Sequence, residues 1–211
     1  MSARQLLPLS GVLSVLLIFV SFMIVGEPPD LDGSNEEILS FYADNEEDLT
    51  FGSALLALGA FFFLVFSTAI AALVRGVRDE TAASANLTFA GGIIFAVGLT
   101  IFAGIAFSAA EAADDVGVGS LRTLQALEMN MFFPLAVGVA AFLFGAGIGT
   151  RRTEALPAWL SWAAIVLGVL AITPAGFLAF LGLGIWTLIV SVTLFMRARS
   201  APDAPAGAPS G

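Results

Sequence analysis

The chain has 211 residues, of which 58% are hydrophobic and 12% are charged, against roughly 25% charged residues in an average soluble domain. A soluble globule of this size could not cover so much apolar surface, so the composition excludes a water-soluble enzyme. The polar residues lie in short segments between long apolar runs, which is typical of a membrane protein with several spanning helices.

The sequence contains no histidine, cysteine or lysine, and all eight cationic residues are arginine. These absences exclude zinc, haem or iron–sulfur sites with His or Cys ligands. They also exclude catalysis by an imidazole base or through a lysine Schiff base. The side chains left for chemistry are carboxylates, hydroxyls, arginines and the single tyrosine, Tyr42. We therefore expect no enzymatic activity, no catalytic residue, no metal site and no cofactor.

Six apolar segments predict an all-α integral membrane protein, a bundle of six transmembrane helices. The predicted spans are residues 6–25, 51–74, 87–110, 129–148, 158–172 and 177–196. The first is longer than the core of a signal peptide and no A-x-A site follows it, so we expect it to be retained. The last two divide one apolar stretch that is about twice as long as a bilayer requires. Pro174 and Gly176 supply the turn signal between them.

The arginines predict which ends of the spans face the cytoplasm. With six spans, seven arginines fall on one side of the membrane and Arg122 falls on the other. The seven are Arg4, Arg75, Arg78, Arg151, Arg152, Arg197 and Arg199. Because cytoplasmic loops collect arginine, both termini are predicted to be cytoplasmic. Residues 1–199 then form one transmembrane domain, and residues 200–211, rich in Ala, Pro, Gly and Ser, form a disordered cytoplasmic tail.

The predicted extracellular loop, residues 26–50, contains nine acidic residues. Residues 34–37 (SNEE) fit a capping box and predict the start of a short extracellular helix between the first two spans. Ile38, Phe41 and Tyr42 then recur at helical spacing and form a narrow apolar stripe. This stripe either packs on the protein's own spans or contacts a ligand or partner.

Asp30-Leu31-Asp32-Gly33-Ser34 resembles part of a calcium-binding loop. The EF-hand pattern places glycine sixth and glutamate twelfth. Here Gly33 is fourth, and Phe41 stands at the twelfth position. We therefore expect no dedicated metal site in this loop.

Glu128 and Asn130 lie at the predicted outer mouth of the fourth span. Ionisable groups inside a membrane are costly and are candidates for a functional site, whereas at a helix end they are commonly solvated. Pro134, one turn deeper, is expected to kink the helix and to open a small outward cavity beside them. Phe41, Tyr42, Glu128 and Asn130 are therefore the candidate ligand or partner contacts.

Small residues and tryptophans add further expectations. Gly145 and Gly149 form a GxxxG motif, which permits close helix packing either within the chain or in a homodimer. Trp159 and Trp162 fit a cytoplasmic aromatic belt. Trp186 lies in the middle of the last span, where packing in the core is expected.

The stretch 36–45 (EEILSFYADN), which runs into a second span ending at Arg75, resembles a family of uncharacterised bacterial integral membrane proteins, mostly actinobacterial. The resemblance implies a short extracellular helix after the first span, about six spans and a bacterial plasma membrane. Family members usually carry basic residues just after the position of Asn45, whereas Glu46-Glu47-Asp48 follow here. The family has no assigned activity, so the resemblance implies no catalytic residues.

These features favour a non-enzymatic structural, sensory or partner-binding membrane protein. The bilayer is its expected environment, with a second copy or another membrane protein as a partner and no nucleic acid. The alternative is a small transporter or permease for an apolar or neutral solute. Transport would need a polar cavity near the middle of the membrane. The hydroxyls available for it are Ser67, Thr68, Thr100, Ser161, Thr187 and Ser191.

Overall fold

The computed structural model describes residues 7–75, 81–113 and 115–200. In this part of the chain the secondary structure is entirely helical, which confirms the predicted all-α class. The helices are α2 (Leu9–Val25), α3 (Asn35–Asp44), α4 (Glu46–Arg75), α5 (Ala82–Glu111), α6 (Val118–Asn130), α7 (Phe132–Thr153), α8 (Ala158–Ala171) and α9 (Gly176–Ser200). Arg4, Arg78 and the predicted tail from residue 201 lie outside the described residues.

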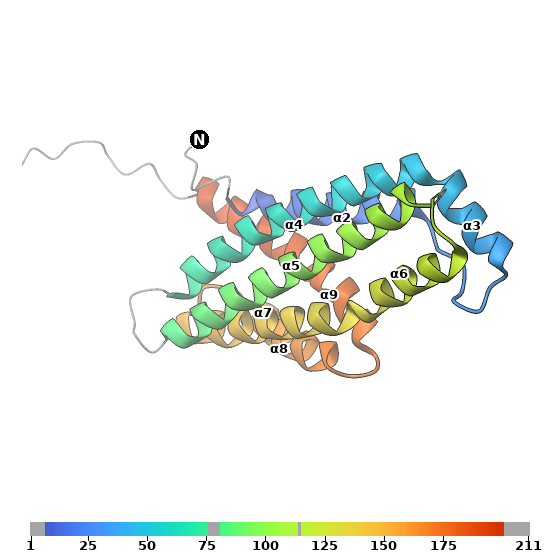
Figure 1. Ribbon diagram of the computed structural model, residues 1–211. Helices are drawn as coiled ribbons and strands as arrows, with labels where there is room; N and C mark the ends of the chain where they lie inside the picture. The colour runs from blue at the N-terminus through green and yellow to red at the C-terminus, as the bar shows by residue number, and fades with distance from the viewer. Residues whose placement is uncertain (1–6, 76–80, 114, 201–211) are drawn as a thin grey trace, which may run out of the picture.

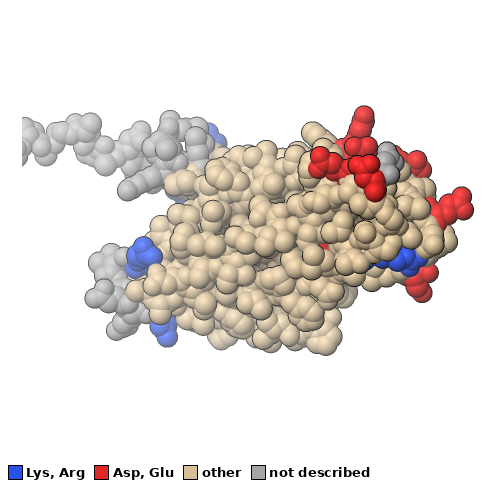
Figure 2. Space-filling view, in the orientation of Figure 1, with Lys and Arg blue, Asp and Glu red and all other residues tan. Residues whose placement is uncertain are grey.

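Four helical segments are long and apolar enough to cross a membrane: α4, α5, the continuous segment Val118–Thr153 and Gly176–Arg199. α2 and α8 are also apolar but shorter, with 17 and 14 residues. The long helices run side by side along one axis, and α3 lies at one end of the bundle (Figure 1). Acidic side chains gather at this end, and arginines gather at the opposite end (Figure 2). We call the first the acidic end and the second the basic end.

Glycines allow α5 and α7 to pack with their backbones nearly in contact. A Cβ atom on Gly91 would lie 2.1 Å from the backbone nitrogen of Phe142, and one on Gly138 would lie 2.6 Å from that of Phe95. Gly145 of the predicted GxxxG motif faces the backbone of α5 in the same way. The motif therefore serves packing within the chain, the first of the two uses expected for it.

Serines of α2 join this helix to α4. Ser14 Oγ donates a hydrogen bond to the carbonyl of Gly59 at 2.8 Å, and Ser21 Oγ donates to that of Gly52 at 2.7 Å. Because neither glycine has a side chain, the two helices approach closely enough for these bonds to form. α2, one of the two shorter apolar helices, is thereby fixed along the part of α4 nearer to the acidic end.

The centre of the bundle is a solid layer of aromatic side chains. The ring centroids of Phe63 and Phe95 lie 4.7 Å apart, and those of Phe63 and Phe142 lie 5.1 Å apart. Trp186 packs against this layer, and only 2% of its surface is exposed. Its indole N–H donates a hydrogen bond to the carbonyl of Leu160 at 2.9 Å. The predicted core position of Trp186 is confirmed.

Several helices begin or end away from the predicted span limits. α4 begins at Glu46 and not at residue 51, because the acidic residues of its first turn interact favourably with the helix N-terminus. α5 likewise begins at Ala82, five residues before the predicted span. The observed hairpin between α8 and α9 agrees with the predicted turn, where the Gly176 N–H donates to the Thr173 carbonyl at 2.9 Å.

The predicted fourth span, residues 129–148, does not match one helix. It begins inside α6, whose regular helical structure is interrupted at Met131, and α7 continues along the same segment to Thr153. Pro134 has no N–H to donate to the carbonyl four residues earlier, so a continuous helix would lose a hydrogen bond there. The kink predicted at Pro134 corresponds to an irregular turn at Met131, where α6 ends and α7 begins.

Candidate functional site

Helix α3 covers the acidic end of the bundle. Ser34 Oγ accepts a hydrogen bond from the Glu37 N–H, and the Glu37 carboxylate accepts one from the Ser34 N–H at 2.7 Å. This reciprocal pair is the predicted capping box. The capping box fixes where α3 begins, and the apolar stripe of α3 then faces the other helices.

The apolar stripe of α3 packs on the protein's own helices. Ile38 and Tyr42 are fully buried in a second hydrophobic cluster with Leu49 of α4 and Leu121 of α6. Phe41 is half-buried, and its ring contacts that of Tyr42 edge-to-face, with centroids 5.3 Å apart. This cluster is distinct from the central aromatic layer, so the acidic end has a small core of its own.

Arg122 and Gln125 of α6 hold the segment that links α2 to α3. The Arg122 guanidinium donates to the carbonyl of Leu31, to the carbonyl of Gly33 at 2.6 Å and to Asn35 Oδ1 at 3.1 Å. Gln125 donates to the carbonyl of Pro29. Sequence reasoning identified Arg122 as the lone outer cation but missed this role, because the partner carbonyls are roughly 90 residues away and carry no sequence signal.

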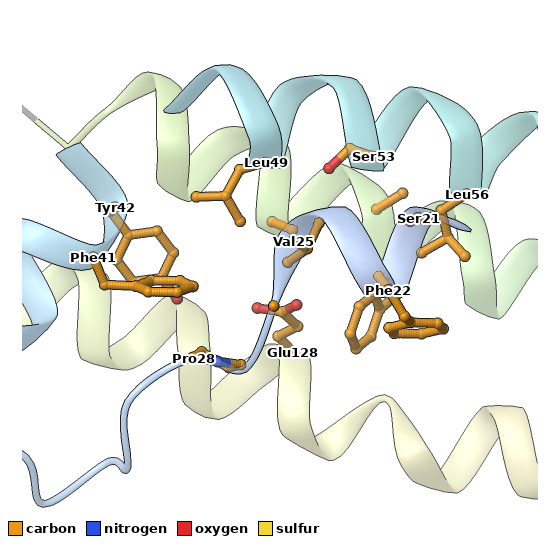
Figure 3. Close-up of a pocket in the computed structure, with 14 residues that line it drawn as sticks. Ser21, Phe22, Val25, Pro28, Phe41, Tyr42, Leu49, Ser53, Leu56 and Glu128 are labelled. Carbon is orange, nitrogen blue, oxygen red and sulfur yellow. The ribbon is translucent and has the colours of Figure 1, made fainter. Parts of the chain in front are cut away.

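A cavity of about 80 Å³ lies beneath α3, among α2, α4, α5 and α6. Its wall is mostly apolar and includes Phe22, Leu49, Leu56 and Phe102. Three polar side chains from three different helices also line it: Tyr42, Ser53 and Glu128 (Figure 3). A cavity of this size has room for two or three water molecules or a small organic molecule.

Two hydroxyl groups in the wall have no hydrogen-bond partner in the protein. Tyr42 is 1% exposed and Ser53 is 7% exposed, and neither Tyr42 Oη nor Ser53 Oγ is hydrogen-bonded. A buried polar atom without a partner costs roughly 1–3 kcal/mol, and native proteins contain few of them. Gln125 Oε1, Thr187 Oγ1 and Ser191 Oγ also lack a partner, but only Tyr42 and Ser53 among these residues line this cavity. The cavity is therefore the candidate site.

Burial, and secondly the nearby Glu128 carboxylate, raise the pKa of Tyr42 to about 12. The phenol is therefore protonated at neutral pH and can both donate and accept a hydrogen bond. The effect of Glu128 on Tyr42 also indicates that the two groups lie in one electrostatic environment. In Figure 3 the Glu128 side chain rises toward Val25 of α2, between the rings of Phe41 and Tyr42 on one side and that of Phe22 on the other.

Three of the four predicted contact residues meet at this cavity, and the fourth does not. Phe41, Tyr42 and Glu128 line it. Asn130 is exposed, and its side-chain amide donates to the carbonyl of Ala126 on its own helix at 2.7 Å. Two residues correspond to about 200° around a helix, so Asn130 points away from the face that carries Glu128. Sequence reasoning missed Ser53, because a serine in an apolar segment gives the same pattern as any other small residue that packs between helices.

The hydroxyls that transport would require do not line this cavity. Ser67, Ser161, Thr187 and Ser191 are fully buried in the bundle. Ser161 is paired with Thr150 at 2.9 Å, and Ser67 donates to the carbonyl of Leu64. Thr68 and Thr100 likewise bond carbonyls of their own helices.

The described residues also contain no group of three or more acidic side chains arranged to hold a metal ion. The calcium-like segment forms a turn in which the Gly33 N–H donates to the Asp30 carbonyl at 2.9 Å.

A second, open and almost wholly apolar groove lies between α8 and α9, beside Trp159, Trp162 and Trp186. Its composition resembles an ordinary lipid-facing surface.

The polar groups of the cavity can donate and accept hydrogen bonds. The cavity offers one carboxylate, one phenol and one alcohol in an apolar wall, without a paired acid and base or an activated nucleophile among the lining residues. No protein-family model, curated protein or solved structure matches this chain.

Proposed function

We propose that this chain is a non-enzymatic, multi-pass protein of a bacterial plasma membrane that binds a small ligand at its acidic end, in a sensory or partner-binding role. The observation that carries the proposal is the pair of buried, unpartnered hydroxyls of Tyr42 and Ser53 on one cavity. The bacterial membrane rests on the resemblance of residues 36–45 and the second span to bacterial membrane proteins.

The proposed topology has six spans and two cytoplasmic termini. It is supported by the alternation of the helices and by the arginines in the last turns of α4, α7 and α9, which lie at the end opposite to the acidic residues (Figures 1 and 2). α2 and α8 are roughly 26 Å and 21 Å long at 1.5 Å per residue, so they approach the ~30 Å thickness of the hydrocarbon core.

Single cysteines test this topology cleanly, because the chain has no native cysteine. A cysteine at Ser34 should react with an impermeant thiol reagent added to intact cells, and a cysteine at Thr153 should react only after lysis. External labelling at Thr153 would show that the proposed orientation or the number of spans is wrong.

Transport is the weaker candidate, because the layer beyond the cavity is closed. Leu56 lines the cavity, and two turns further along α4 Phe63 meets Phe95 and Phe142 in the aromatic layer. A solute that passed from the cavity to the basic end would have to separate these rings. The binding site and the closed centre together support recognition at one face of the membrane.

The ligand-binding proposal is tested by the access of a small molecule to the cavity. Ser53→Cys places the chain's only thiol in the wall, and Ser67→Cys places it on the same helix at a fully buried position away from the cavity. With methyl methanethiosulfonate we expect Ser53→Cys to react at least roughly tenfold faster, since thiol reactivity requires access. Equal rates in two folded variants would contradict the proposal.

A further inference from the structure

We propose that the cavity takes a small organic cation, an alkylammonium ion whose ammonium group lies against the Glu128 carboxylate. This inference rests on the proposed ligand-binding function and adds the chemical class of the ligand. Four features of the cavity carry it: its charge, its aromatic wall, its hydroxyl acceptors and the field around it.

The wall contains one acidic side chain and no basic side chain that could balance it. Glu128 is the one charged side chain among the residues that line the cavity. The nearest arginine along α6, Arg122, donates to Leu31, Gly33 and Asn35 in the linker above. A carboxylate in a largely apolar wall is costly unless it is paired, and a bound cation would offset that cost.

The rest of the wall is rich in aromatic rings. Phe22 and Phe102 form an edge-to-face pair with centroids 6.1 Å apart, and Phe41 pairs with Tyr42 on the α3 side. Aromatic faces attract ammonium groups through their quadrupole, most strongly where water is excluded. An anion would be repelled by the same faces and by Glu128, and a neutral molecule would gain from neither.

The unpartnered oxygens match the donors of a primary ammonium group. Such a group has three N–H donors and no acceptor. The cavity presents the Glu128 carboxylate, Tyr42 Oη and Ser53 Oγ, all of which can accept a hydrogen bond. A ligand of this kind would find an acceptor at the carboxylate and further acceptors at the two hydroxyls of the same wall.

The surroundings would concentrate cations at the cavity. Nine acidic residues lie between residues 26 and 50, and acidic side chains dominate this end of the molecule (Figure 2). A surface of one sign raises the local concentration of ions of the opposite sign. The volume of about 80 Å³ limits the buried part of the ligand to a short chain.

The sole tyrosine makes a direct test possible. The full chain, labelled with ring-¹³C tyrosine and placed in lipid nanodiscs, has one tyrosine signal, that of Tyr42. Propylammonium should shift this signal in a saturable manner. 1-Propanol, which is nearly the same size and neutral, and propionate, which is anionic, should bind at least tenfold more weakly or not at all.

A matched pair of variants tests the role of the charge. Glu128→Gln should weaken propylammonium binding at least tenfold, which corresponds to about 1.4 kcal/mol, and should leave 1-propanol unaffected. Glu111→Gln removes an exposed carboxylate at the same end and should leave the affinity within twofold of the unmodified chain. If Glu128→Gln does not fold, the ligand series on the unmodified protein decides the question.

The outcomes separate this inference from the proposed function. Equal binding of 1-propanol and propylammonium, with no effect of Glu128→Gln, would overturn the ammonium assignment and leave ligand binding standing. A Tyr42 signal that no probe shifts, together with an unreactive Ser53→Cys, would overturn both.

Discussion

The centre of the bundle and its acidic end share α4 and α5, yet they are packed in different ways. At the centre Phe63, Phe142 and Trp186 are at most 2% exposed and fill the space between the helices. At the acidic end the same helices surround a cavity, and the hydroxyls of Tyr42 and Ser53 have no partner in the protein. Protein interiors are normally close-packed with their polar atoms paired. Thr187 Oγ1 and Ser191 Oγ of α9 also lack a partner, but they lie in the packed bundle and do not line the cavity. The comparison therefore separates a closely packed region from one that combines a cavity with unpartnered hydroxyls in its wall, and this combination supports the proposed binding.

The largest expected effect comes from removing a ring at the centre. Phe142→Ala should lower the free energy of unfolding by about 3 kcal/mol, the low end for such a truncation, because unfolded helices remain in an apolar solvent in the bilayer. Phe61→Ala on α4, whose ring is mostly exposed, should change it by no more than ~0.5 kcal/mol. Reversible unfolding in bicelles provides the measurement, and similar losses for both variants would show that the central layer is not specially packed.

Removing the arginine that holds the linker should loosen the acidic end without affecting the centre. Arg122→Met loses the hydrogen bonds to Leu31, Gly33 and Asn35, so we expect the local stability of α3 to fall by about 1–2 kcal/mol. Hydrogen exchange of the α3 amides should accelerate while that of α7 stays unchanged. Arg75→Met at the basic end is the control, and unchanged exchange in α3 of the Arg122 variant would contradict the clamping role.

Replacing either of two serines of the cavity wall by alanine should change the stability of the protein differently. Ser21 donates to the carbonyl of Gly52, so Ser21→Ala should destabilise the protein by about 1 kcal/mol. Ser53 has no partner, so Ser53→Ala should be neutral or slightly stabilising. The same unfolding assay in the absence of ligand compares them. A destabilised Ser53→Ala would indicate that the hydroxyl is already paired, which would weaken the case for the cavity.

The last effect concerns the ionisation of Tyr42 and is observed spectroscopically at high pH. Burial and the Glu128 carboxylate raise the pKa of Tyr42 to about 12, above the ordinary value near 10. Because the folded pKa exceeds the unfolded one, the associated stabilisation is complete below about pH 10 and is lost as the pH rises through about 12. Ultraviolet absorbance of the phenolate should report this single group.

The same titration examines the electrostatic effect of Glu128 on Tyr42. Glu128→Gln removes the smaller of the two causes and should lower the pKa of Tyr42, while burial keeps it above that of a free tyrosine. Tyr42→Phe should abolish the absorbance change altogether. Ionisation of Tyr42 near pH 10 in the folded protein would mean that the cavity is open to water.

The sequence by itself determined the features that depend on neighbouring residues. The capping box at Ser34 and Glu37, the turn between Pro174 and Gly176 and the break near Pro134 all follow from local backbone chemistry. The apolar runs likewise indicated helices that can cross a membrane, since this property depends on length and composition.

Only the tertiary structure decided which polar side chains share a site. Tyr42, Ser53 and Glu128 lie on three different helices, and their meeting at one cavity depends on how α3, α4 and α6 pack. Helix geometry also excluded Asn130, which lies on another side of α6 from Glu128. Helical periodicity shows which face of one helix is apolar, but the depth and rotation of each helix against its neighbours are set by side-chain packing across the whole bundle.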